Sequence, residues 1–216
     1  MEEHKIRGIQ SSNGSKFKTI CERCNNEHLG ENDSEVARVC KSLTNRIRRY
    51  SISRNSPNIV VDVNAVKYSR AMIGHILSAT SVEECKTESQ ISPYFDPLKQ
   101  FVLGNNDAIS DTHEIYYWFY PYDRHVSAKY VGFKNEGHTA IVSLLSFFPI
   151  AFMVTKINEG TYPFHARKLS LSDTKLELDL SPRGFEYSAF PFHELRGNQL
   201  LAMVDYQATV SDPIEE

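Results

Sequence analysis

The sequence predicts an α+β fold, with helices in the first half of the chain and a mostly antiparallel β-sheet in the second half. Apolar residues recur at helical spacing between residues 35 and 80. From Glu114 onward, β-branched and aromatic residues dominate. The chain has 216 residues, of which 41% are hydrophobic and 11% aromatic, so it has enough apolar side chains for a packed core.

Three helices are expected. The first runs over 35–49, behind a segment at 32–34 that offers N-capping side chains. The polar stretch 51–58, which contains Ser56-Pro57, is predicted to be a linker. Further helices are predicted over 64–80 and 96–102. The apolar face of the first helix consists of Val36, Val39, Cys40, Leu43 and Ile47.

The expected strands lie between turn signals such as Asn135-Glu136-Gly137 and Asn158-Glu159-Gly160. The segment Ile115–Tyr120 is dense in aromatic strand formers, which favours the core of a sheet over a surface that stacks nucleobases. The other predicted strands are 127–133, 139–145, 150–157 and 175–178.

Charge is distributed unevenly along the chain. Residues 1–61 carry 11 Lys and Arg against 7 Asp and Glu, a balance of +4. Residues 62–216 carry 13 against 20, a balance of −7, and the whole chain has a net charge of −3. This asymmetry favours a nucleic-acid-facing front joined to another unit, with a chance excess of charge as the alternative. With the predicted linker, the chain divides into a unit at 1–50 and a second α+β domain at 59–216, whose role the sequence leaves open.

No membrane segment is expected. The N-terminus lacks the apolar region of a signal peptide. The longest apolar stretch, 141–154, is interrupted by Ser143, Ser146 and Pro149 and falls short of the roughly 20 residues that a membrane span needs. Four cysteines are too few for a disulfide scaffold in a chain of this length. We therefore expect a cytoplasmic protein.

Cys21 and Cys24 form a Cys-x-x-Cys pair, which can hold one Zn²⁺ because a tight turn directs both sulfurs to the same side. A redox pair and an incidental pair are the alternatives. Tetrahedral zinc needs further ligands. His28, Cys40 or His4 would supply them, or a partner subunit, including a second copy of the chain, would complete the site.

The string from Cys21 to Gly30, Cys-Glu-Arg-Cys-Asn-Asn-Glu-His-Leu-Gly, follows an earlier Glu3-His4-Lys5-Ile6. Together these segments resemble the HNH endonuclease family, in its bacterial and phage branch with a Cys-x-x-Cys-Asn-Asn motif. The resemblance covers about the first forty residues. It implies a small ββα-metal module in that part of the chain. Together with the helices and strands predicted above, the expected chain is α+β, with this module followed by a helical connector and a mostly antiparallel sheet domain.

The resemblance also implies roles for single residues. His4 would be the general base, and Glu3 and Asn25 would be ligands of a catalytic Mg²⁺ or Mn²⁺. Cys21 and Cys24 would hold a structural Zn²⁺. The implied activity is metal-dependent hydrolysis of DNA phosphodiester bonds, in bacterial or phage defence if the family's usual context applies.

The chain departs from the family pattern at two points. Many members carry another Cys-x-x-Cys before the Glu-His strand, and this chain begins just before that strand. The middle Asn of the motif has no clear counterpart, since Lys16 lies near its place and Asn13 is a loose substitute. The alternative is therefore a non-catalytic zinc-binding module that contacts nucleic acid or another protein.

The first predicted helix is basic. No acidic residue occurs between Val36 and Val61. A run of cations without acids favours contacts to DNA phosphates, with an ordinary solvated face as the alternative. The predicted contact residues are Arg38, Lys41, Arg46, Arg48, Arg49 and Arg54.

Overall fold

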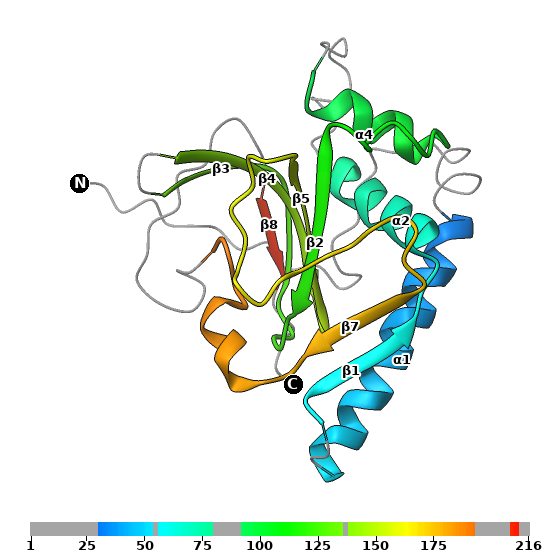
Figure 1. Ribbon diagram of the computed structural model, residues 1–216, viewed down its shortest axis with the longest axis vertical. Helices are drawn as coiled ribbons and strands as arrows, with labels where there is room; N and C mark the ends of the chain where they lie inside the picture. Colours follow the sequence, from blue (N-terminus) through cyan, green and yellow to red (C-terminus); the bar gives the residue numbers. More distant parts are fainter. Residues whose placement is uncertain (1–29, 54–55, 80–91, 136–137, 193–207, 212–216) are drawn as a thin grey trace.

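The protein is described here from a computed structural model. The structure describes residues 30–53, 56–79, 92–135, 138–192 and 208–211 (Figure 1). The helices in these ranges are α1 (Gly30–Ser53), α2 (Ala65–Ser78), α4 (Phe95–Val102) and the 3₁₀ helix η2 (Pro182–Tyr187). The strands are β1 (Asn58–Asp62), β2 (His113–Phe119), β3 (His125–Asn135), β4 (His138–Phe147), β5 (Ile150–Lys156), β6 (Arg167–Lys168), β7 (Lys175–Asp179) and β8 (Ala208–Ser211).

The strands form two sheets. The larger sheet has six strands in the order β6-β2-β5-β4-β3-β8, and each recorded neighbour pair is antiparallel. The smaller sheet pairs β1 with β7, also antiparallel. Helices α1, α2 and α4 lie to one side of the larger sheet in Figure 1, and the β1–β7 pair lies beside α1. The predicted combination of helices with a mostly antiparallel sheet is confirmed.

Both faces of the larger sheet are buried, and β2 shows why its sequence is so rich in aromatic residues. Ile115 and Tyr117 belong to a large apolar cluster that includes residues of the three helices and of β1 and β7. Tyr116 and Trp118 point to the opposite face and join a second cluster with Phe190. Because successive side chains of a strand alternate between faces, an unbroken apolar run fits a strand covered on both sides.

Helix α1 docks on this core through the apolar stripe that its sequence predicts. Val39 and Leu43 are fully buried in the same cluster as residues of α2, β1 and β7. The start of α2 is fixed by Asn64, whose side-chain oxygen accepts a hydrogen bond from the Lys67 amide at 3.1 Å. That contact is the N-cap expected of an Asn at the position before a helix.

Three details of the predictions were wrong. The first helix is longer than 35–49, and Ser34 does not cap it but donates to the Glu31 carbonyl within the helix. The predicted linker 51–58 begins as helix, since α1 runs to Ser53, and the hydroxyls of Ser51 and Ser53 donate to carbonyls one turn earlier in that helix. It ends as strand β1, which the sequence reading missed.

The ββα-metal module expected within 1–50 lies largely outside the described residues. Of that unit, only α1 from Gly30 onward is described. The division into 1–50 and 59–216 therefore stays a prediction. Among the described residues, no helix is long and apolar enough to cross a membrane.

Candidate nucleic-acid interface

Some of the predicted site residues lie within α1, and the others lie in segments that the structure does not describe. The described ones are Arg38, Cys40, Lys41, Arg46, Arg48 and Arg49. The other predicted site residues lie outside the described part of the chain, and these are Glu3, His4, Cys21, Cys24, Asn25, His28 and Arg54.

Cys40 is a free, half-buried thiol on α1. Burial raises its pKa to about 11, so the thiol is protonated at neutral pH. Zinc binds the thiolate, and a ligand role for Cys40 would therefore require the ion to displace that proton. Within the described ranges, no group of three or more His, Cys, Asp or Glu side chains is arranged to hold a metal ion.

The basic residues of α1 fall on two different faces of the helix. Arg38, Arg46 and Arg49 line the hollows between α1 and β1. Lys41 and Arg48 are exposed and seven residues apart, which places them together on the face turned away from the buried stripe. Helix α1, which the sequence predicts to be basic, therefore presents two separate cationic surfaces.

Arg38 holds elements of the fold together and is not a free cation. Its guanidinium donates two hydrogen bonds to the Glu35 carboxylate, at 2.9 and 2.7 Å, and one to the Asp62 carbonyl at 2.9 Å. The same carboxylate accepts the Asn64 amide at 2.6 Å. The hydrogen bonds from Arg38 and Asn64 lower the pKa of Glu35 against the opposing effect of its burial. This network ties α1 to the end of β1 and the start of α2.

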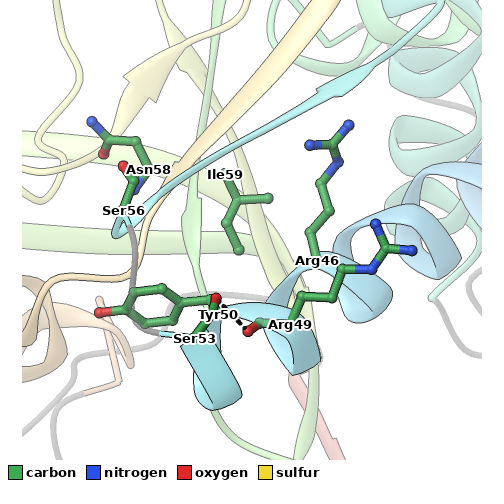
Figure 2. A pocket seen from close by; sticks show the side chains of 7 residues that line it. All are labelled: Arg46, Arg49, Tyr50, Ser53, Ser56, Asn58 and Ile59. Atoms are coloured by element: carbon green, nitrogen blue, oxygen red, sulfur yellow. Dashed lines mark hydrogen bonds between the residues drawn. The ribbon is translucent and has the colours of Figure 1, made fainter.

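The groove between α1 and β1 consists of two adjoining hollows of about 190 and 210 Å³. Arg46 and Arg49 line both hollows and therefore mark the point where they meet. Figure 2 shows these two arginines projecting from α1 on one side of Ile59, with Ser56 and Asn58 on the other side. The remaining lining side chains are Arg38, Ser42, Asn45, Tyr50, Ser53, Val61 and Asp62. We refer to this surface as the α1–β1 groove.

The electrostatic character of the α1–β1 groove is set by Arg46 and Arg49. Both are exposed, and neither forms an ion pair with another described residue. Among the described residues of the lining, Asp62 is the acidic one, and it lies at the end where Arg38 lies. Hydroxyl and amide side chains supply further hydrogen-bond donors along the walls. Two uncompensated guanidinium groups beside neutral donors suit an anionic, oxygen-rich ligand.

The sequence reading missed two features of this site. The Glu35–Arg38 pair has the three-residue spacing of a helical ion pair, a signal that could have identified it. The role of β1 had a weaker signal, because Ile59 and Val61 alternate with neighbours but Val60 interrupts the apolar-polar pattern. Comparisons of the chain with protein-family models, curated proteins and solved structures find no match.

Proposed function

We propose that this chain is a metal-dependent, HNH-type endonuclease that holds the DNA backbone through the α1–β1 groove. The observation that carries the proposal is the pair Arg46 and Arg49, two exposed guanidinium groups without ion-pair partners among the described residues. They lie on the helix that directly follows the Cys-x-x-Cys-Asn-Asn segment. Guanidinium contacts to phosphate position a nucleic acid without reading its sequence.

The donor chemistry of the preceding segment fits two kinds of metal ion. The thiols of Cys21 and Cys24 suit zinc, with His28, Cys40 or a partner subunit completing the set. The Glu3 carboxylate and the Asn25 carbonyl oxygen suit Mg²⁺ or Mn²⁺. A bound divalent ion would stabilise the negative charge that develops on the scissile phosphate.

In this proposal, different residues of the chain have different roles in hydrolysis. His4 takes a proton from the attacking water as general base. Arg46 and Arg49 fix the backbone of the same DNA strand, which lowers the entropic cost of bringing phosphate and water together. Arg38 holds α1 against β1 through the Asp62 carbonyl, and Glu35 joins α1 to the start of α2 through the Asn64 amide, so this network keeps Arg46 and Arg49 in place.

The alternative is a module that binds nucleic acid or another protein without cleaving. It is favoured by one observation, that the middle Asn of the HNH motif has no clear counterpart and Lys16 lies near its place. Without that Asn, nothing identified in the sequence orients His4 as a base.

A plasmid-nicking assay with Mg²⁺ or Mn²⁺ separates the two functions. The endonuclease reading expects the purified chain to nick supercoiled DNA, and expects His4→Ala to abolish nicking while fluorescence anisotropy shows nearly unchanged DNA binding. Metal-independent binding with no nicking would support the alternative. Absence of both nicking and binding would refute the endonuclease and the nucleic-acid-binding form of the alternative.

A further inference from the structure

Among the described residues, strand β1 has a strand neighbour on one side only, which is β7. The Leu180 amide donates to the Pro57 carbonyl and the Val63 amide to the Thr174 carbonyl. In an antiparallel pair, residues alternate between bonding the partner strand and pointing away from it. Odd-numbered residues of β1 therefore bond β7, and Asn58, Val60 and Asp62 direct their backbone groups outward.

Two of these outward residues already have local partners. The Asp62 carbonyl accepts a hydrogen bond from Arg38, and the Asn58 amide donates one to the Ser56 hydroxyl oxygen. Within the described part of the chain, the amide and carbonyl of Val60 have no recorded partner. Val60 as a whole residue is 36% exposed, and Asn58 and Asp62 on either side of it along the edge are exposed as well.

The α1–β1 groove runs along the outer edge of β1. Arg38 reaches the outward carbonyl of Asp62 from α1, so the flank of α1 that carries Arg38 faces this edge. Arg46 and Arg49 lie further along that flank, beside Asn58, Ile59 and Val61. An open strand edge with alternating donors and acceptors thus runs along two free guanidinium groups.

We infer that the α1–β1 groove accepts an extended acidic peptide, which adds to β1 as a third strand. The alternation of N–H and C=O along an edge complements another peptide backbone, whereas a phosphodiester offers acceptors only and could bind the two arginines but not pair with the strand edge. Carboxylates on the side of the added strand that faces α1 would meet Arg46 and Arg49.

This inference rests on the proposed function in one respect: peptide and DNA would use the same two arginines and exclude each other. The peptide would then act as a competitive inhibitor of DNA binding. It differs from DNA in needing the outward amide of Val60, and the two ligands can therefore be separated by a backbone substitution.

The probe is an acetylated, amidated hexapeptide of alternating glutamate and valine with a fluorescent label. Its control is the same peptide with N-methylated amides, which keeps the charge but cannot pair as a strand. Binding is measured by anisotropy, in parallel with a short labelled DNA duplex. The protein variants are Val60→Pro, Val60→Thr and the double variant Arg46→Ala with Arg49→Ala.

Proline is tolerated where a strand amide faces outward, so Val60→Pro should keep the fold, which thermal unfolding verifies. We expect Val60→Pro to reduce the affinity for the peptide by about tenfold, which corresponds to one backbone hydrogen bond, and to leave the affinity for DNA unchanged. Val60→Thr should bind both ligands normally. The double arginine variant should bind neither the peptide nor the DNA. Unlabelled peptide should displace DNA from the wild-type chain.

The inference is overturned if the N-methylated peptide binds as well as its parent, because attraction would then be charge alone. It is also overturned if Val60→Pro binds the peptide normally, or if no peptide binds while DNA does. That last result leaves the proposed function intact. Failure of DNA binding with normal peptide binding would refute the proposed function and support a peptide site.

Discussion

Removal of the Glu35 carboxylate should loosen the attachment of α1 to the rest of the fold. The side chain of Glu35 is 11% exposed and accepts hydrogen bonds from Arg38 and from the Asn64 amide. In Glu35→Ala these bonds are lost, and the Arg38 guanidinium keeps only its contact with the Asp62 carbonyl.

The magnitude follows from the number of bonds and their exposure. The Arg38 side chain is 46% exposed, so its pair with Glu35 is placed at the lower end for charge-assisted bonds, about 1.5 kcal/mol. The bond from the Asn64 amide to a carboxylate adds about as much, for a total near 3 kcal/mol. For a chain of this size that corresponds to a melting temperature lower by roughly 9 °C.

The effect should depend on pH in a defined direction. Hydrogen bonding from Arg38 lowers the pKa of Glu35 in the folded chain below its ordinary value of 4.5. The stabilisation is therefore complete above that ordinary value and is lost as the pH falls through the folded-state pKa.

Thermal and urea unfolding of the wild type, Glu35→Ala, Arg38→Ala and the double variant provide the assay. A double-mutant cycle isolates the pairwise contribution. The reasoning would be refuted by a loss below about 1 kcal/mol, or by a wild-type advantage that is the same at pH 7 and at pH 3.

Two further predictions concern other ionisable and metal-binding groups. Burial and the nearby Lys156 lower the pKa of His113 from 6.5 to about 4. The unfolded chain therefore takes up the proton first, and the wild type should lose about 3 kcal/mol between pH 6.5 and 4 relative to His113→Gln. Urea unfolding across that range checks this, and parallel curves for both proteins would contradict it. Elemental analysis of the purified chain should find one zinc per chain, or half a zinc if two chains share the site, and Cys21→Ala should release it. A zinc-free wild-type chain would rule out the structural metal.

The fold was predictable where the information is local. Aromatic and β-branched runs gave the four long strands of the larger sheet, and the spacing of Val39 and Leu43 gave the buried face of α1. Strand β1 was missed because Val60 interrupts the apolar-polar alternation of its five residues and Ser56-Pro57 just before it is typical of a linker. Its partner β7 has the same length and was predicted, because Leu176 and Leu178 alternate with charged residues.

The candidate site was predictable by residue type but not by geometry. The lack of acids between Val36 and Val61 correctly marked α1 as basic. Which cations are free depends on tertiary contacts, since Arg38 is occupied by Glu35 and Asp62, whereas Arg46 and Arg49 form no ion pair with another described residue. The predicted roles of His4 and the two N-terminal cysteines come from the resemblance to HNH endonucleases and stay predictions.

The most direct test of the proposed DNA interface is the salt dependence of binding. Affinity for a short DNA duplex is measured by anisotropy over a range of salt concentrations for the wild type and for Arg46→Ala with Arg49→Ala. Each lost phosphate contact should reduce the slope of log affinity against log salt by about 1, so the double variant should lose about 2. Arg183→Ala, an exposed arginine on η2, is the matched control and should keep the wild-type slope. An unchanged slope in the double variant would contradict the account, because the two arginines would then not contact phosphate.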